Sequence, residues 1–286
     1  MISDSGQTTE GVRPPRMRLR FIRWNLHLIT LVYIVLSTVS ILIFGWPALW
    51  LGISAALLVL LITIGMALPG SSLFYPTITH GPRNNSRIAL TFDDGPDPDM
   101  TPLVLDTLAQ DNTHATFFVI GKWLVAHPEL AKRIVAEGHV LGNHSWSHSR
   151  WQNFYFTKRH MQEIKNCERA IQAANGSSLP VLYRPPVGLK SGDLARATYR
   201  HNLTLVAWSL HSQDTRRSDP EKIARRVLKK IRGGDIVLLH DGHDLMGRHR
   251  PYCALTVALI LQGLRAKGLE CVTIPELLNL SNKALP

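Results

Sequence analysis

Thr91-Phe92-Asp93-Asp94-Gly95-Pro96 is the stretch from which the fold of this chain can be predicted. It ends an apolar run that begins at Ile88, which is typical of a buried strand, and its Gly-Pro pair is a turn signal. Two adjacent carboxylates then stand at the C-terminal end of a strand, where α/β folds carry their chemistry. The stretch therefore predicts an α/β fold with Asp93 and Asp94 at its reactive edge.

A second stretch, Asn143-His144-Ser145-Trp146-Ser147-His148, follows about fifty residues later. Its two histidines are four residues apart, a spacing that lets two imidazoles face one ion. Together with Asp94 they predict a metal site of two histidines and one carboxylate, with coordination positions left open. Asp93 stands beside this site as a candidate general base.

Three later strand-like runs also end on polar residues. Val181–Arg184 runs into Pro185, Leu203–Leu210 is followed by Asp214, and the run from Asp235 ends on His240. From Ser86 onward, strand-like and helix-like segments alternate, which is the pattern of parallel strands in an α/β fold. The predicted strands are Ile88–Phe92, Ala115–Ile120, His139–Gly142, Val181–Arg184, Thr204–Leu210, Ile236–Leu239 and Leu269–Thr273.

With these motifs in order between about Arg87 and Ile274, the chain resembles the polysaccharide deacetylases with a NodB homology domain, carbohydrate esterase family 4. The resemblance implies a distorted (β/α)7 barrel. It also implies a metal-dependent hydrolase that removes N-acetyl or other N-acyl groups from an amino sugar. Zinc is the default metal for histidine-rich ligation, and nickel, cobalt or iron would satisfy the same ligands.

The resemblance further implies a role for each motif residue. Asp93 would be the catalytic base, kept ionised by Arg184, and the metal ligands would be Asp94, His144 and His148. His240 would be the general acid, oriented by Asp214. The substrate would be contacted by Leu238 in the acetyl pocket, by Pro185, and at Tyr183, after which a backbone N–H would help to hold the oxyanion.

Two motifs depart from the pattern of that family. Val187 stands where an aromatic residue is usual, and His211-Ser212-Gln213-Asp214-Thr215 replaces Asp-x-x-Asp-Trp. The changed positions would border the sugar, so two substrates stay open: a lipid-linked amino sugar, or a cell-wall or matrix polysaccharide outside the cell. A deformylase, an O-acyl esterase and an inactive sugar-binding membrane protein are further alternatives.

The N-terminal part of the chain has a different composition. No Lys, Arg, Asp or Glu occurs from Asn25 to Pro82, and the apolar runs Leu28–Phe44 and Ala48–Leu68 are each about long enough to cross a bilayer. We therefore expect a basic tail over residues 1–24, two transmembrane helices over 25–68, a linker over 69–86 and a deacetylase domain over 87–280.

Arginines precede the first apolar run, and the turn between the runs is uncharged. The positive-inside rule then predicts a multi-pass protein of the bacterial inner membrane with its catalytic domain in the cytoplasm. The formal net charge of +11 comes without a nucleic-acid-binding module, so the expected partners are an amino-sugar glycan or lipid-linked sugar and the membrane, not nucleic acid.

Overall fold

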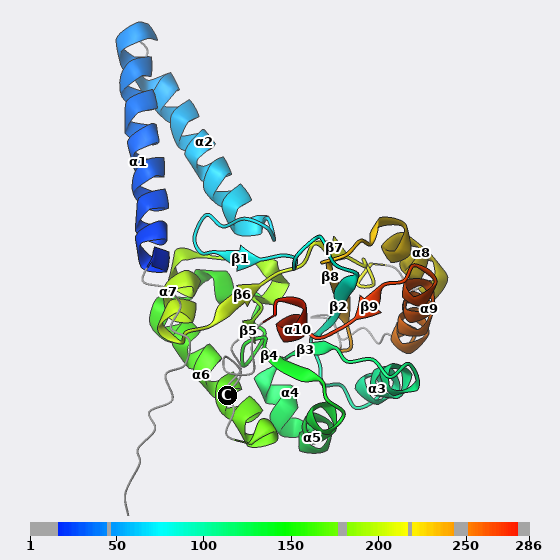
Figure 1. The fold of residues 1–286 in the computed structure, drawn as a ribbon. Coiled ribbons are helices and arrows are strands. Elements are labelled where there is room, and N and C mark those ends of the chain that lie inside the picture. The colour runs from blue at the N-terminus through cyan, green and yellow to red at the C-terminus, as the bar shows by residue number, and fades with distance from the viewer. Residues whose placement is uncertain (1–16, 45–46, 177–181, 217–218, 243–250, 280–286) are drawn as a thin grey trace, which may run out of the picture.

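The structure is a computed structural model. It describes residues 17–44, 47–176, 182–216, 219–242 and 251–279. Parallel strands surrounded by helices form one body, from which two long helices, α1 (Met17–Phe44) and α2 (Pro47–Ala67), project side by side (Figure 1). Most of the basic tail that the sequence predicts, residues 1–16, lies outside the described residues.

Strand β2 (Arg87–Asp93) is the centre of the sheet. It pairs in parallel with β3 (Thr116–Val119), β8 (Ile236–His240) and the short β9 (Glu270–Cys271). The order of the strands is β1-β6-β5-β4-β3-β2-β8-β7. The remaining strands are β1 (Thr77–Ile78), β4 (Val140–Asn143), β5 (Leu182–Tyr183), β6 (Thr204–Val206) and β7 (Leu210–His211).

The run Thr204–Leu210, which the sequence predicts as one strand, is two strands. Strand β6 pairs with β5 and β1 near one end of the strand order, whereas β7 pairs with β8 at the other end. The chain between them changes partners: Ala207 N donates to Ile78 O, and Ser209 N donates to Ile236 O. This crossing curls the sheet on itself, so the predicted fold of parallel strands and helices is confirmed as a curled half-barrel.

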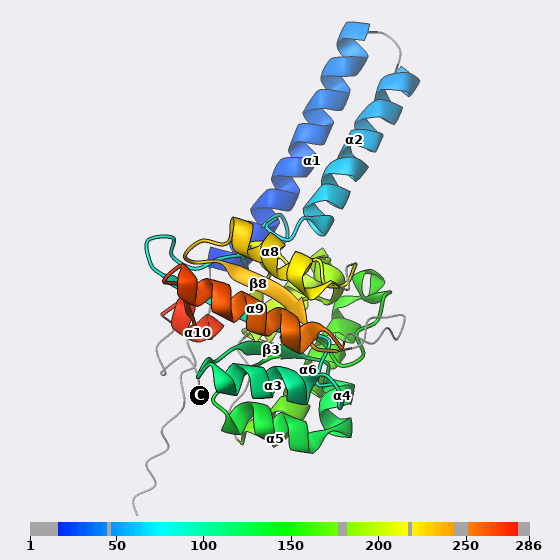
Figure 2. The same ribbon diagram turned by 90° about the vertical axis from the view of Figure 1, so that its right-hand side faces the viewer.

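Helices cover the outside of the strands. Figure 2 shows α8, α9, α3 and α5 one below another along one side of the sheet. The helices are α3 (Thr101–Gln110), α4 (Gly121–Ala126), α5 (Pro128–Ala136), α6 (Thr157–Asn175), α7 (Gly192–Arg200), α8 (Pro220–Lys230), α9 (Cys253–Ala266) and α10 (Ile274–Leu277), with single 3₁₀ turns η1 (Gln152–Phe154) and η2 (Pro186–Gly188).

The main core lies between the strands and these helices. Phe92 of β2 stacks on Phe117 of β3 with ring centroids 4.9 Å apart, and both side chains are fully buried. Leu105 of α3 and Ile260 of α9 belong to the same buried cluster. Burying side chains of this size contributes about 1.5–3 kcal/mol each, so the packing holds the strand ends, and the side chains on them, in fixed positions.

The two apolar runs near the N-terminus do form helices, but the prediction that they cross a membrane is wrong. A crossing needs about 20 consecutive apolar residues in one helix. In the part of the chain that the structure describes, no helix combines that length with that apolarity. Helix α1 also takes in Arg18, Arg20 and Arg23 at its start. The predicted multi-pass location, and the cytoplasmic placement derived from it, are corrected accordingly.

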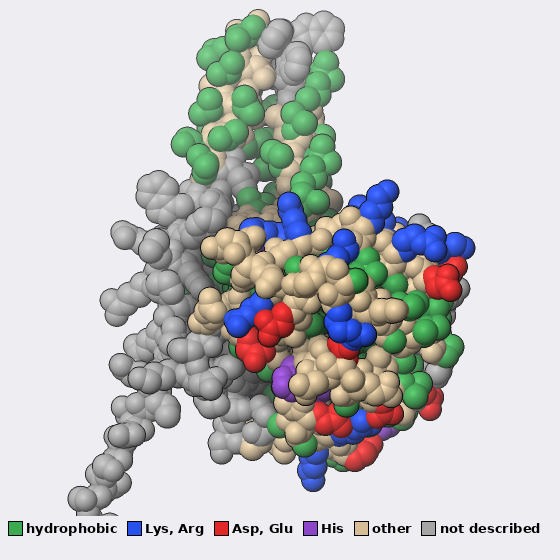
Figure 3. All heavy atoms as spheres, turned by 45° about the vertical axis from the view of Figure 1, so that its right-hand side comes forward, with side chains coloured by type: hydrophobic (Ala, Val, Ile, Leu, Met, Phe, Trp, Pro, Cys, Tyr) green, Lys and Arg blue, Asp and Glu red, His purple; other side chains and the backbone are tan. Residues whose placement is uncertain are grey.

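Hydrophobic side chains nonetheless cover much of α1 and α2 where they stand clear of the rest of the protein (Figure 3). Leu31, Leu42 and Leu60 are among those with more than half of their surface exposed.

The end of α2 is fixed to the body of the protein by Lys190. Its ammonium group donates to the carbonyl oxygens of Leu68 at 3.0 Å, Pro69 at 2.6 Å and Ser71 at 2.8 Å. Cations are favourable at a helix C-terminus because the last carbonyls there lack helical partners. Burial lowers the pKa of Lys190 to about 8. These contacts tie the end of α2 to the segment that follows β5.

Candidate active site

Strand β2 delivers both predicted carboxylates to one edge of the sheet. Asp93 is its last residue and lies in register with His240, the last residue of β8. Asp94 follows with a left-handed backbone (φ 75°), a conformation that costs a non-glycine residue energy and is frequent at functional sites. The next residue must be glycine, because a Cβ on Gly95 would lie 2.4 Å from Asp241 Oδ2.

The structure brings the three predicted metal ligands together. Asp94 Oδ1 lies 3.3 Å from His148 Nε2 and 3.6 Å from His144 Nε2. One atom from each residue lies within 4.8 Å of the others. Zinc-type ions bind nitrogen and oxygen at about 2.0–2.2 Å, so one ion fits between these atoms.

The protonation states of these residues also suit a cation. His144 Nδ1 donates to Arg184 O at 2.8 Å, which leaves Nε2 as the ligand atom. Burial, together with the neighbouring His144, lowers the pKa of His148 to about 4, so its imidazole is neutral at neutral pH. Burial alone would raise the pKa of Asp94, but the three nearby histidines bring it below its usual range. Two imidazoles and one carboxylate are a donor set for a divalent metal.

Arg184 holds the second carboxylate in place. Its guanidinium is fully buried and donates to Asp93 Oδ1 at 2.7 Å and to Thr91 Oγ1 at 2.8 Å. A further nitrogen donates to Ala207 O at 2.9 Å, and the group lies 4.0 Å from the centre of the Phe118 ring. Burial lowers the pKa of Arg184, while the charge and hydrogen bond of Asp93 act in the opposite direction. The other oxygen of Asp93 lies 3.7 Å from His144 Nε2, beside the metal ligands.

His240 and Asp214 form the second predicted pair. His240 Nδ1 lies 2.9 Å from Asp214 Oδ1, and the backbone N–H of His240 donates to Asp214 Oδ2 at 2.8 Å. Ser212 Oγ also donates to Asp214 Oδ1, at 2.9 Å. The carboxylate is therefore fixed from two sides, and it fixes the imidazole ring in turn.

The predicted substrate contacts are less uniform. Leu238 lies in register with Thr91, whose hydroxyl accepts a hydrogen bond from Arg184. The side chain of Leu238 therefore points to the same side of the sheet as that of Thr91. Tyr183 is fully buried, and its hydroxyl accepts a hydrogen bond from Gln152 at 2.7 Å. The backbone N–H after it, that of Arg184, donates to Asn143 O within the sheet. The structure therefore does not offer Tyr183 or that N–H to a substrate, and Pro185 is likewise buried.

Sequence reasoning missed several neighbours of the site. Thr91 was missed because a threonine inside an apolar strand does not by itself indicate a functional residue. Asp241 is another: Thr101 donates to its Oδ2 at 2.6 Å, and burial raises its pKa to about 7. His211, noted only as a departure from a motif, places its ring centre 6.3 Å from that of His240.

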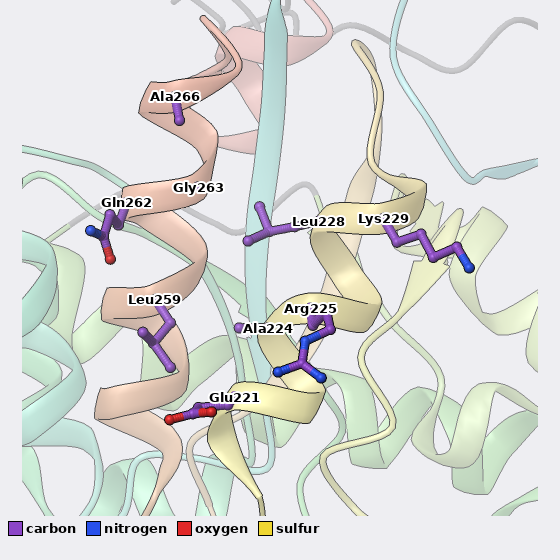
Figure 4. Close-up of a pocket in the computed structure, with 9 residues that line it drawn as sticks. All are labelled: Glu221, Ala224, Arg225, Leu228, Lys229, Leu259, Gln262, Gly263 and Ala266. Carbon is purple, nitrogen blue, oxygen red and sulfur yellow. The ribbon is translucent and has the colours of Figure 1, made fainter.

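A separate hollow lies elsewhere on the molecule. A groove of about 720 Å³ runs between α8 and α9, with Leu228 of α8 pointing toward Gly263 of α9 (Figure 4). Lys229 points away from α9 in the same view. The groove has none of the predicted site residues in its lining, so its size does not make it the reactive site.

Comparisons with known proteins identify the family of this chain. The sequence profile of the family described as "Polysaccharide deacetylase" matches residues 80–206. A chitooligosaccharide deacetylase from Bradyrhizobium sp. (strain ANU 289) is 37% identical over 199 residues, which cover 66% of this chain and 90% of that protein.

Solved structures show the same likeness. The Bc1960 peptidoglycan N-acetylglucosamine deacetylase superposes with a TM-score of 0.67 at 32% identity, covering 72% of this chain and 94% of that one. A family 4 carbohydrate esterase from Streptomyces lividans, in complex with acetate, has a TM-score of 0.58 at 30% identity and covers 65% and 92% of the two chains.

Proposed function

Since this chain belongs to the polysaccharide deacetylase family and is a carbohydrate N-deacetylase, we propose that it removes acetyl groups from N-acetylglucosamine residues of a chitooligosaccharide- or peptidoglycan-type glycan. One observation carries the proposal: the Asp93 carboxylate, bound by a buried arginine, lies beside the Asp94, His144 and His148 cluster and in register with His240. The residues that we propose as base, cation ligands and acid thus lie at one edge of the sheet.

Asp94, His144 and His148 would hold the divalent cation, whose Lewis acidity polarises the amide carbonyl. Zinc is the metal that this donor set favours, with nickel, cobalt and iron as alternatives. Asp93 would accept the proton of the attacking water. Its Oδ1 already accepts a hydrogen bond from the positively charged guanidinium of Arg184, so its Oδ2 is the oxygen that would take the proton. His240, oriented by Asp214, would give a proton to the departing amine.

The choice of glycan rests on the relatives. The relatives described above are deacetylases of chitooligosaccharide and of peptidoglycan N-acetylglucosamine. The lipid-linked substrate expected from the sequence depended on a membrane hairpin, and no span was found in the described residues. An oligomeric amino-sugar glycan is therefore the substrate class we propose.

The test is release of acetate from N-acetylglucosamine oligomers and from peptidoglycan fragments by the purified full chain. Asp93→Asn keeps the shape and removes the proton acceptor, so turnover should fall by about a hundredfold or more. Asp106→Asn, which changes an exposed carboxylate on α3, is the matched control. Release of formate, or of acetate from O-acetyl esters alone, would instead identify the deformylase or O-acyl esterase that the same site could support.

A further inference from the structure

His211, the last residue of β7, points to the side of the sheet that carries the proposed base and acid. It lies in register with Leu238 of β8, which in turn lies in register with Thr91 of β2. Residues in register on neighbouring parallel strands share a side of the sheet, as do residues two apart on one strand. Asp93 and His240 follow these two strand residues at a distance of two positions. The imidazole of His211 therefore lies on the reactive side.

Two neighbours fix the ring of His211. The backbone N–H of Gln213 donates to its Nδ1 at 2.9 Å. Gln213 has a left-handed backbone (φ 67°), a conformation that costs a non-glycine residue energy and recurs at functional sites. The Trp208 ring lies nearly perpendicular to the imidazole, with ring centres 5.8 Å apart. The orientation of the imidazole is thus set before a ligand arrives.

The bond from Gln213 also fixes the position of the ring proton. A ring nitrogen that accepts a hydrogen bond carries no proton, so the proton of the neutral imidazole lies on Nε2. Burial, together with the neighbouring His240 and Arg216, lowers the pKa of His211, while Asp214 and Asp93 act in the opposite direction. His211 is therefore a neutral N–H donor at neutral pH.

This donor is open to a ligand. Among the residues that the structure describes, none accepts a hydrogen bond from His211 Nε2, and this nitrogen is not one of the buried atoms that lack a partner. The residue is only partly buried. The Asp-x-x-Asp-Trp pattern of the family has a carboxylate at this position, and an ionised carboxylate only accepts hydrogen bonds. This chain places a donor there instead.

His240 lies close to this donor. The centres of the two imidazole rings are 6.3 Å apart, and their planes are tilted by 45°. His240 would protonate the departing nitrogen. In an N-acetylglucosamine ring, both carbons next to the one that bears this nitrogen carry an oxygen. A second N–H beside the acid is therefore placed to meet one of these oxygens while the nitrogen faces His240.

We infer that His211 is a substrate-binding residue whose Nε2–H donates to an oxygen of the amino sugar beside the nitrogen that leaves. The contact would orient the sugar at the acid and would select rings that offer an acceptor oxygen at that place. The inference rests on the proposed function and adds a specificity-determining residue to it.

The experiment compares His211→Leu, which removes the donor, with His211→Gln, whose amide keeps an N–H near the position of Nε2. His127→Leu, on the turn between α4 and α5, is the matched control. Acetate release from the N-acetylglucosamine trimer is measured with the purified full chain. We expect kcat/KM to fall about tenfold in His211→Leu, mainly through KM, and by less than about threefold in His211→Gln. Equal losses in the two variants, or the same loss in His127→Leu, would overturn the contact.

The pH dependence separates a substrate contact from an effect through His240. A contact leaves the alkaline limb of the kcat profile where it is when His211 is replaced by leucine. A shift of that limb would show that His211 tunes the acid instead, and would overturn the inference.

A binding measurement separates this inference from the proposed function. Asp93→Asn is titrated calorimetrically with the trimer, alone and combined with His211→Leu. Weaker binding in the combined variant supports the contact, even if the unchanged protein releases no acetate, in which case the proposed function alone fails. Equal affinity of both variants for the trimer, or binding by neither, would overturn the contact.

Discussion

Arg184 and Asp93 form a buried ion pair in which an arginine nitrogen donates to Asp93 Oδ1 at 2.7 Å. The guanidinium has no exposed surface, and it also bonds Thr91 and the carbonyl oxygen of Ala207. One side chain thus connects the end of β2 with the segment that crosses between β6 and β7. The position of the proposed base is therefore coupled to the curling of the sheet.

Replacing Arg184 by methionine should reduce both stability and activity. Removing one partner of a buried pair leaves the other charge uncompensated, at a cost of about 3–5 kcal/mol. Chemical denaturation should show this loss in the free energy of unfolding. Arg184→Lys should restore the charge but not the forked geometry, so its turnover should stay well below normal. An Arg184→Met protein with unchanged stability would contradict the coupling of base and barrel.

His144→Ala and His148→Ala should each lower the metal content of the purified protein, and the double variant should retain almost none. The ligands lie after β4 rather than within the main hydrophobic core, so the far-UV circular dichroism spectrum should not change. Elemental analysis measures the metal. His201→Ala is the control, since His201 Nδ1 lies 2.9 Å from Glu168 Oε2 and away from the predicted ligands. Full metal content in the double variant would remove these residues from the proposed ligand set.

Asp214→Asn should change the pH dependence of turnover. The carboxylate lies 2.9 Å from His240 Nδ1, and its negative charge favours the protonated ring that acts as the acid. Without that charge, the alkaline limb of the activity profile should move to lower pH, and the maximum rate should fall at least tenfold. A lower rate with an unmoved limb would mean that Asp214 orients His240 without tuning it.

His139 should make the fold sensitive to acid. Burial, with the charges of His114 and Arg133, lowers its pKa to about 4, and its Nδ1 accepts a hydrogen bond from Ala115 N. The unfolded chain takes up this proton below about pH 6.5, whereas the folded chain does not until about pH 4. The free energy of unfolding should therefore decrease as the pH falls through this range, by at most about 1.4 kcal/mol per pH unit for this residue.

The check is urea denaturation between pH 7 and pH 4, with His139→Asn beside the unchanged protein. Asparagine can still accept the Ala115 hydrogen bond but does not titrate, so its curve should be flatter. His127→Gln, a more exposed histidine on the α4–α5 turn, should leave the slope unchanged. Parallel curves for His139→Asn and the unchanged protein would contradict the assignment.

The sequence by itself determined the parallel α/β fold and the elements that carry the chemistry. Apolar runs that end on Asp93, Arg184 and His240 are local patterns, and parallel strands bring their C-terminal ends to one edge. The His-x-x-x-His spacing likewise indicates one ion without knowledge of the fold. The predicted fold is confirmed and the predicted ligand side chains lie together, because the signal lies within a few residues of each of them.

Only the tertiary structure decided the strand pairing, burial and pKa values that depend on contacts between residues far apart in the chain. The run Thr204–Leu210 reads as one strand, yet Ala207 and Ser209 find hydrogen-bond partners on opposite ends of the sheet. Tyr183 is buried against Gln152, and burial in the folded protein raises the pKa of Asp241. The helices predicted for the N-terminal apolar runs are confirmed, whereas the prediction that they cross a membrane is wrong. A local sequence pattern indicates where strands and helices form. The whole fold determines which of their residues are buried and which strands pair.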